Sequence, residues 1–408
     1  MKMFCKIFAF LFVVVALVCC NEGALPENEV EIPLDPNKKY IHIDAGVSTR
    51  GALVEDDVLK DNFHVLGYQY RGDWETAKVL ATPNVFDSIP ELVSYNANAG
   101  VYSYETIQSW SGNTYSFFGY YPSDSEKINL FGGGAAMAGE PYIMYDFPTD
   151  SDPTLHIDVM TAEYIDTGVA SSSTVQMHFK HRLCAVDVGA RNYYEIEEYV
   201  DASGSTVSLG GPTPVTIEIT GLYVALTNIV NTKAKIYLNS SIPTEYPNAQ
   251  TKASVNYVMV GSPAWAPTTF DVKPNTASDR GIRLVTHSTG ENASSLMFIP
   301  QDELVSGTVD LYYRKKFVTA DGKTLYQRIS EGATGETVYK WTELPMPTDD
   351  ALQFYTFQPS LNKINFDKPL IEGRRYYIEL TFTSDAVSVN IVAADEWNTK
   401  PDISYEFE

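Results

Sequence analysis

Cysteine, histidine and basic residues are scarce in this chain of 408 residues, which has four cysteines and six histidines. Lysine and arginine together number 29 against 52 aspartates and glutamates, so the formal net charge is −23. A chain with this excess of negative charge is repelled by phosphates and by anionic lipids. The composition therefore disfavours nucleic-acid binding and electrostatic binding to a membrane surface.

No apolar run reaches the roughly twenty residues that a membrane-spanning helix needs. The longest apolar run, Ile7–Val18, follows Lys2 and Lys6. A short apolar run behind positive charge predicts a secretory signal peptide rather than a membrane-spanning helix. We expect this leader to comprise residues 1–19.

The end of the leader, Leu17-Val18-Cys19-Cys20, resembles a bacterial lipobox, in which diacylglycerol acylates the thiol at the cut site. Cys20 is the predicted lipidation site because a small residue precedes it and a leucine lies three residues before it. Cys19 is the alternative. A chain that begins at Cys20 keeps Cys184 as its only other thiol and cannot form an internal disulfide.

Alternating apolar and polar residues dominate the chain after an acidic, proline-containing segment at 21–39, which we interpret as a tether. Tyr40–Ala45 and Phe63–Tyr70 alternate in part. Val175–Ala185 alternates throughout and predicts one strand, with Cys184 on its polar face. Short helical pieces are predicted only near 56–61 and 193–199. The pattern predicts an all-β fold.

Turn signals separate several of the predicted strands. The parity of the apolar residues changes at Gly221, which predicts a β-bulge. Asp321-Gly322 predicts a hairpin with a type I′ turn. Ser384-Asp385-Ala386 predicts a second hairpin, and the small, polar residues before Ser173 place a domain boundary near residue 170.

Catalytic and metal-binding motifs are missing from the sequence. His178 and His181 lie three apart on a predicted strand, so their side chains point to opposite faces and cannot hold one ion together. We expect His181 to be a core histidine bonded to a backbone group. Neither a Gly-x-Ser-x-Gly elbow nor a His-Glu-x-x-His motif occurs. We therefore predict that the protein is not an enzyme and binds no cofactor or metal.

Several short motifs resemble, in order, those of the fimbrillin-like, or type V pilin, family of surface lipoproteins. The motifs are Trp110 with Tyr115–Pro122, Asp158–Ala162, Val175–Val186, Leu296–Gln301, and Gly373–Tyr377 with Val392 and Trp397. Cys184 stands where the family has alanine, and the exchange of one small residue for another leaves the register intact.

The resemblance implies two β-sandwich (transthyretin-like) domains in tandem, which polymerise by donor-strand exchange. The expected segments are a signal peptide at 1–19, a tether with a removable first strand at 20–50, an N-terminal sandwich at 51–170 and a C-terminal sandwich at 171–408. A sandwich that lacks one strand has an apolar groove and an unpaired edge, which a neighbour's extended segment can fill. Each subunit would give one strand and receive one, so the assembly is an open filament.

The resemblance also implies that a trypsin-like protease cuts behind the first strand. The matching position is Arg50, followed by Gly51, in a stretch of glycines and small residues that suits an exposed loop. An ordinary solvated arginine is the alternative. For the donated strand we consider the C-terminal Asn398–Glu408, which alternates at its end and could equally be a last strand of its own domain.

Three functions remain after these observations. The first is a structural pilus subunit at the outer membrane surface, with other pilin subunits, the processing protease and the lipoprotein export machinery as partners and a lipid anchor as its only membrane contact. The second is a pilus-tip adhesin or carbohydrate-binding surface lipoprotein. The third, a hydrolase, has no recognisable site. Whether the protein both donates and receives strands, or only receives one, distinguishes the first two.

Overall fold

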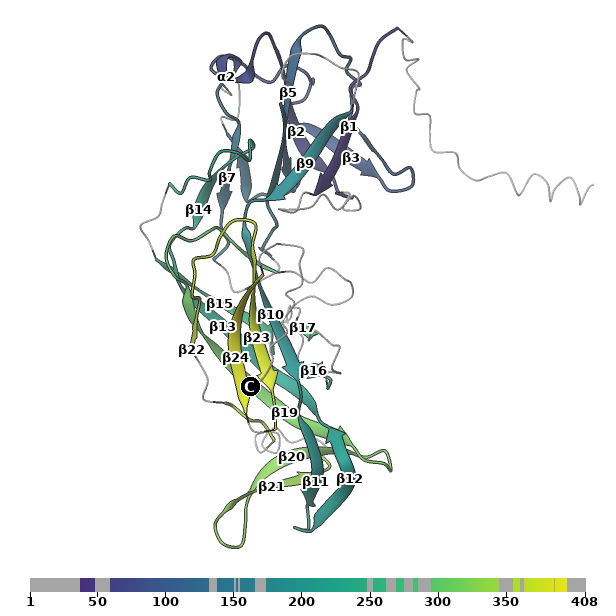
Figure 1. The fold of residues 1–408 in the computed structure, drawn as a ribbon, viewed down its shortest axis with the longest axis vertical. Helices are drawn as coiled ribbons and strands as arrows, with labels where there is room; N and C mark the ends of the chain where they lie inside the picture. Colours follow the sequence, from purple (N-terminus) through teal and green to yellow (C-terminus); the bar gives the residue numbers. More distant parts are fainter. Residues whose placement is uncertain are drawn as a thin grey trace, which may run out of the picture. The chain divides into compact units, whose positions relative to one another are not determined.

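The computed structural model describes residues 37–47, 59–131, 138–149, 152, 155–165, 174–247, 252–261, 269–274, 282–284, 295–344, 355–359, 363–384 and 386–394. The described residues from Ile41 onward belong to one compact unit. Its secondary structure is almost entirely β, which confirms the predicted fold class (Figure 1). The one helix in the described ranges is α2 (Trp74–Ala77), which Asp73 caps by accepting a hydrogen bond from the Thr76 N–H at 2.8 Å.

A seven-stranded sheet contains most of the N-terminal strands, in the order β1-β9-β8-β5-β2-β3-β4. The strands are β1 (Ile43–Val47), β2 (Phe63–Tyr70), β3 (Glu91–Asn96), β4 (Val101–Ser103), β5 (Thr114–Tyr121), β8 (Met160–Ile165) and β9 (Val175–His181). Alternate residues of β2 and β5 enter two different cores, because Phe63 and Phe117 lie in one apolar cluster and Leu66 and Phe118 in another. Both faces of this sheet are therefore buried at β2 and β5.

A three-stranded sheet supplies part of the apolar cluster that contains Leu66 and Phe118. It consists of β6 (Ile128–Leu130), β7 (Tyr142–Asp146) and β14 (Lys233–Tyr237) in the order β14-β7-β6. Ile143, Tyr145 and Ile236 are fully buried in that cluster. Figure 1 shows β7 and β14 side by side, although some ninety residues separate them in the sequence.

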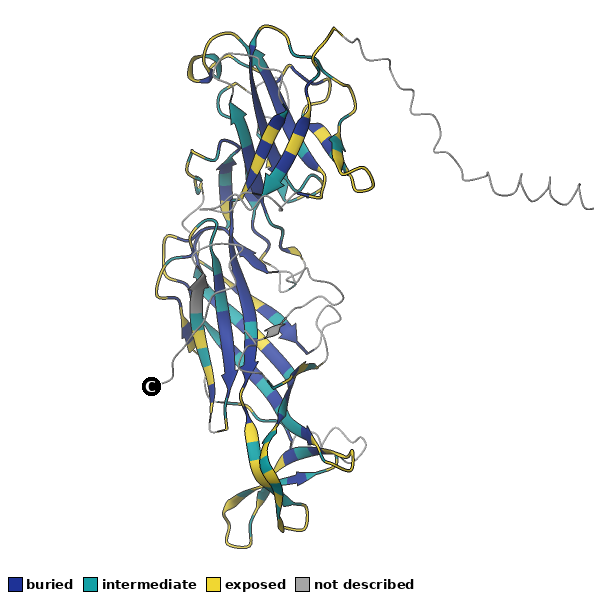
Figure 2. Ribbon diagram, turned by 45° about the vertical axis from the view of Figure 1, so that its right-hand side comes forward, coloured by how far each residue is buried: buried dark blue, intermediate teal, exposed yellow. Residues whose placement is uncertain are grey.

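The remaining strands form two further sheets. The five-stranded sheet contains β10 (Cys184–Asn192), β17 (Ile282–Leu284), β18 (Leu296–Phe298), β23 (Arg375–Phe382) and β24 (Val387–Ala394). The nine-stranded sheet contains β11 (Glu195–Asp201), β12 (Thr206–Pro214), β13 (Thr216–Ile229), β15 (Ala253–Val260), β16 (Phe270–Val272), β19 (Ser306–Val318), β20 (Thr324–Glu331), β21 (Thr337–Thr342) and β22 (Lys363–Asn365). Val188 and Ile378 of the first sheet and Val224 and Leu311 of the second share one core. Figure 2 shows the buried strands of these layers in dark blue.

The single strand predicted over Val175–Ala185 is wrong, because the chain leaves one sheet and enters another within it. β9 ends at His181 and alternates between buried and exposed residues, whereas β10 begins at Cys184 and is buried along nearly its whole length. Cys184 is fully buried and does not lie on a polar face. The reason is that β10 has neighbours on both sides, β23 in parallel and β17 and β18 antiparallel, so it lies inside its sheet.

Arg182 stands at this change of sheet and is 1% exposed. Its Nε lies 2.8 Å from Oε1 of Glu372. Its two Nη atoms donate hydrogen bonds to four oxygens, those of Thr161 (3.0 Å), Tyr237 (2.8 Å), Ile242 (3.2 Å) and Thr244 (3.2 Å). A buried guanidinium needs such a full set of acceptors. Arg182 thereby joins β8, β14 and two loops at the point where the chain passes from β9 to β10.

The structure confirms the predicted bulge at Gly221 and the predicted hairpin at Asp321-Gly322, but not the turn type. The pairing of β13 with β19 shifts between Ile219 and Gly221, which confirms the bulge. β19 and β20 form the predicted hairpin around Asp321-Gly322, but only Gly322 has a positive φ, of 84°. A type I′ turn needs positive φ at both central residues, so that turn type is wrong. The Gly322 N–H instead donates to the Thr319 carbonyl at 2.9 Å.

Of two further predicted elements, the structure confirms the second hairpin and contradicts the helical piece. β23 and β24 pair from Arg375–Ala394 to Phe382–Val387, which confirms the second hairpin. The helical piece predicted near 193–199 is wrong, because Glu195–Asp201 is strand β11 and pairs with β12 and β21. Two neighbouring strands determine the backbone there, and weak local helix propensity does not compete with them.

The division between domains near residue 170 stays a prediction. In the structure β9 joins the seven-stranded sheet and β14 pairs with β7. Segments that follow residue 170 in the sequence therefore complete layers built from segments that precede it.

Candidate functional site

β1 is the terminal strand of the seven-stranded sheet, and it runs parallel to β9. The register extends from Ile43 opposite Val175 to Val47 opposite Phe179. The backbone of β1 thus has one ladder partner among the described strands, and its other side also lies near β4. A terminal strand with a single ladder can be exchanged for another strand without breaking the rest of the sheet.

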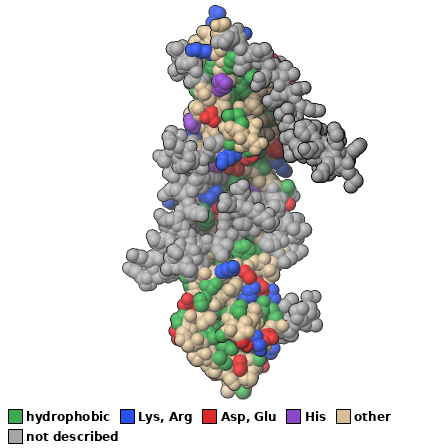
Figure 3. Space-filling model, turned by 90° about the vertical axis from the view of Figure 1, so that its right-hand side faces the viewer, with side chains coloured by type: hydrophobic (Ala, Val, Ile, Leu, Met, Phe, Trp, Pro, Cys, Tyr) green, Lys and Arg blue, Asp and Glu red, His purple; other side chains and the backbone are tan. Residues whose placement is uncertain are grey.

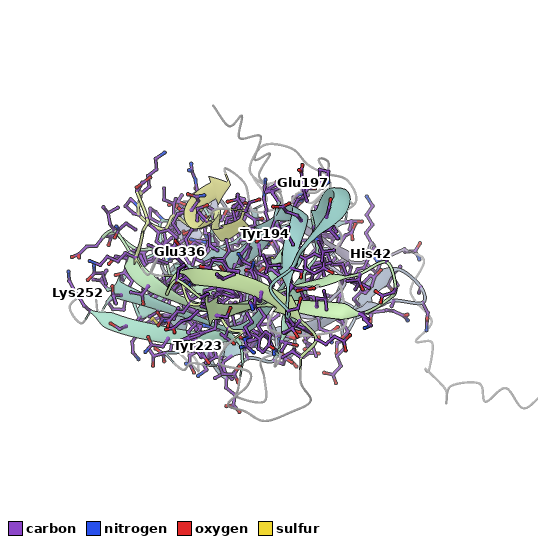
Figure 4. The ribbon with its side chains drawn as sticks, turned by 90° about the horizontal axis from the view of Figure 1, so that it is seen from below. His42, Tyr194, Glu197, Tyr223, Lys252 and Glu336 are labelled. Carbon is purple, nitrogen blue, oxygen red and sulfur yellow. The ribbon has the colours of Figure 1, made fainter. Side chains whose placement is uncertain are left out.

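Alternate side chains of this segment fill the core beneath the sheet. Ile41, Ile43 and Ala45 are 1%, 6% and 4% exposed and belong to the same apolar cluster as Phe63 and Phe179. His42 and Asp44 alternate with them and face solvent; Figure 4 labels His42. Burial of the two isoleucines alone contributes about 3–6 kcal/mol to holding the segment in place.

Two tyrosines near β4 hold the backbone of the segment from the other side. The Tyr104 hydroxyl donates a hydrogen bond to the Ile41 carbonyl at 2.7 Å. The Tyr102 hydroxyl donates to the carbonyls of Ala45, at 3.2 Å, and Leu59. Burial raises the pKa of both phenols, so they remain protonated donors at neutral pH.

Backbone groups complete the contacts of this segment. The Ile41 N–H donates to the Gln108 carbonyl at 2.8 Å, and the Val175 N–H donates to the His42 carbonyl at 2.7 Å. The role of Tyr102 and Tyr104 was not predicted from the sequence. Their spacing in Val101–Tyr104 places both rings on one side of the chain, and this was the available signal.

The predicted site residues Cys20, Arg50 and Gly51 lie outside the described residues, as does the C-terminal segment Asn398–Glu408. β1 ends three residues before Arg50 in the sequence, and the described chain resumes at Leu59. The structure therefore describes the first strand and its groove, and processing and donation stay predictions.

Groups that could carry chemistry lie elsewhere and are engaged in packing. The Cys184 thiol donates to the Phe298 carbonyl at 3.2 Å, and burial raises its pKa far above the usual range of a thiol. Burial lowers the pKa of His156 to about 4. The Nδ1 atom of this histidine contacts the backbone of Met297. No group of three or more His, Cys, Asp or Glu side chains in the described ranges is placed to hold a metal ion.

His181 differs from its prediction in one respect. Its Nδ1 lies 2.8 Å from a carboxylate oxygen of Asp158, a side-chain partner that was not predicted from the sequence. Asp158 lies two residues before β8, the neighbour of β9, and it meets His181 where β8 begins and β9 ends. Within the part of the chain that the structure describes, there is no helix with the length and apolar character of a membrane crossing.

Comparison with known proteins confirms the resemblance noted from the sequence. The fimbrillin-like family model matches residues 58–397, so the chain belongs to this family. No curated protein matches the sequence.

One of three solved structures that align with most of this chain has a TM-score above 0.5. A fimbrial protein from Bacteroides vulgatus has a TM-score of 0.53 at 18% sequence identity, over 87% of this chain and 99% of that chain. A candidate cell adhesion protein from Bacteroides ovatus has a TM-score of 0.40 at 14% identity, over 89% and 99%. The C-terminally truncated tip fimbrial protein Mfa3 from Porphyromonas gingivalis has a TM-score of 0.33 at 13% identity, over 88% and 99%. Family membership supports a pilus subunit or an adhesin.

Proposed function

We propose that the protein is a structural pilus subunit that is exported as a lipoprotein and assembled by donor-strand exchange. In this proposal the export machinery acylates Cys20, and the lipid holds the immature subunit at the surface of the outer membrane. A trypsin-like protease then cuts between Arg50 and Gly51 and frees the segment that contains β1. Other pilin subunits are the partners in the filament.

The position and burial of β1 carry this proposal. Its loss would expose the aromatic core around Phe63 and Phe179 and leave the edge of β9 without its partner. The groove would then offer pockets for alternate apolar side chains together with a row of unpaired backbone groups. An incoming strand is recognised by both of these features.

The C-terminal segment Asn398–Glu408 is the proposed donor. Its last residues, Ile403-Ser404-Tyr405-Glu406-Phe407, alternate between apolar and polar side chains. A segment with this period presents its apolar side chains to one face of a sheet, as Ile41, Ile43 and Ala45 do now. We expect deletion of Asn398–Glu408 to give folded monomers that do not polymerise, as measured by size-exclusion chromatography and electron microscopy.

A reversible crosslink tests the removal of β1 directly. Asp44 and Gln176 are register partners on β1 and β9, and their side chains meet at 3.3 Å on the exposed face. Neighbouring strands bring Cα atoms within the distance that a disulfide spans. We expect a subunit with Asp44→Cys and Gln176→Cys to be cut by trypsin yet retain β1 and stay monomeric. Added reductant should restore polymerisation.

Matched variants separate this effect from damage to the fold. The single variant Asp44→Cys should polymerise with and without reductant. Arg50→Ala should leave the subunit uncut and monomeric. The control Arg71→Ala, at an exposed arginine of the described chain, should change neither cleavage nor assembly. Polymerisation of the oxidised double variant at the normal rate would contradict the removal of β1.

A further inference from the structure

Two hairpins at one end of the nine-stranded sheet border a half-open cavity of about 790 Å³. One wall consists of β20 and β21, and the turn between β11 and β12 contributes Ala202. In Figure 3 the region of these strands, at the bottom of the view, carries both basic and acidic side chains. The volume lies in the range of sites that hold small ligands.

Two basic side chains from neighbouring strands line this cavity. Arg328 of β20 is the register partner of Lys340 of β21, and both residues line the cavity. Cross-strand partners have Cβ atoms about 4.5–5.5 Å apart, and like charges in this arrangement destabilise a sheet. Among the described residues neither cation has an ion pair, although Glu331 also lines the cavity. Two like charges on register partners at a solvent-open cavity favour a ligand of opposite charge.

Neighbouring strands of the same sheet show a different arrangement. Arg314 and Lys316 on β19 also approach each other, but Glu218 on β13 lies 2.6 Å and 3.0 Å from their nitrogens. This part of the sheet thus provides its own carboxylate for a pair of cations. Among the described residues, no carboxylate forms an ion pair with Arg328 or Lys340.

The Lys340 ammonium is held close to the β11–β12 turn. A Cβ added at Gly204 of that turn would lie 3.6 Å from Lys340 Nζ. Gly204 has a φ of 93°, a conformation that other residues rarely adopt. Ser330 and Thr342 add hydroxyl groups to the same wall. The cavity therefore combines two positive charges with one carboxylate, that of Glu331, and small polar groups.

We propose that this cavity binds an acidic saccharide through its carboxylate or sulfate group. The cavity wall contains no aromatic ring, so neutral sugars lack a stacking surface, and recognition rests on charge. An acidic peptide fits less well, because Arg328 and Lys340 lie on paired inner strands whose backbone groups have no free edge. The saccharide class rests on the proposed function at the cell surface, whereas the anion site rests on the geometry alone.

Titration calorimetry with the unpolymerised full subunit tests this proposal. The probes are 3′-sialyllactose, galactose 6-sulfate, neutral lactose and sodium sulfate. We expect the two acidic saccharides to bind and lactose not to bind, with affinity that falls as salt is raised. Arg328→Gln and Lys340→Gln should each weaken binding at least about tenfold, because each removes a charge-assisted hydrogen bond.

Lys363→Gln is the control, since Lys363 is an exposed lysine of β22 away from the cavity, and it should leave binding unchanged. Equal binding of lactose and sialyllactose would overturn the proposal, as would unchanged binding by both cavity variants. Binding of sulfate alone, or of poly-glutamate in place of saccharides, would also overturn it. The assay uses monomers, so a failure of strand exchange would not affect its result.

Discussion

Lys315 occupies an unusual environment on the inner side of β19. It lies on the same face of β19 as the buried Tyr313 and Phe317, and its Nζ lies 4.2 Å from the centre of the Tyr194 ring and 5.4 Å from that of Phe357. Figure 4 labels Tyr194. Burial lowers the pKa of Lys315 from 10.5 to about 8, because the charged form loses hydration that the rings replace only in part.

Because of this shift, the free energy of unfolding varies with pH in the alkaline range. Below about pH 8 both states carry the proton, and the folded state bears the full cost of the buried charge. Between about pH 8 and 10.5 the unfolded state binds more protons, so the free energy of unfolding rises with pH. We expect Lys315→Met to be more stable than the parent by roughly 1–3 kcal/mol at pH 7, and this difference to vanish by pH 10.5.

Urea denaturation at a series of pH values measures this effect. Lys363→Met, at an exposed lysine, should show no difference that varies with pH. A gain for Lys315→Met that stays constant up to pH 10.5 would mean that improved packing, and not the charge, causes it.

The backbones of β13 and β19 approach each other so closely at Gly307 that only glycine fits there. Gly307 of β19 lies opposite Leu226 of β13, and a Cβ added there would lie 2.1 Å from the Ala225 carbonyl oxygen. No side chain fits at this distance, so β13 and β19 would have to move apart.

We expect Gly307→Ala to destabilise the fold by about 1–3 kcal/mol, because overpacking of paired strands displaces their backbones. Gly112→Ala is the matched control, since a Cβ there meets nothing within 4 Å. Thermal unfolding of the two variants measures the difference. Equal melting temperatures would show that the pair of strands adapts without cost.

Strands with one solvent-facing side were predictable from the sequence. β9 (Val175–His181) alternates between buried and exposed residues and lies within the predicted Val175–Ala185. The change of parity at Gly221 marks the bulge in β13. In such strands the alternation of side chains records which face is buried. β10 was not predictable in the same way, because a strand buried on both faces loses this alternation.

The candidate site was predictable only in part. Alternation over Tyr40–Ala45 indicated the strand that became β1, whose observed bounds are Ile43–Val47. Its parallel partner β9 lies more than a hundred residues later, and nothing local in the sequence encodes that pairing. The hydroxyls of Tyr102 and Tyr104 reach backbone carbonyls, which carry no sequence signal. The cavity cations Arg328 and Lys340 become neighbours only through the β20–β21 register.

The charge of the whole molecule bears on its association with other copies. The chain has a formal net charge of −23, so two subunits repel each other before a donor strand reaches its groove. Salt screens this repulsion, with a Debye length of about 30 Å at 0.01 M and about 8 Å at 0.15 M.

We expect polymerisation of cut subunits to be several-fold faster at 0.15 M than at 0.01 M sodium chloride, as followed by light scattering. Sucrose at matched osmolality is the control and should not accelerate the reaction. A rate that falls with salt would indicate that attraction between local patches, and not the net charge, governs the encounter.

The long pairing of β13 with β19 has a consequence for mechanical load. The two strands stay paired from Thr216–Lys316 to Thr227–Ser306, with one bulge at Gly221. Antiparallel hydrogen bonds lie perpendicular to the strands, so tension along the strands loads the whole row in shear. Peeling from one end would instead break the bonds one at a time. A subunit stretched along these strands should therefore withstand far greater force than one peeled across them.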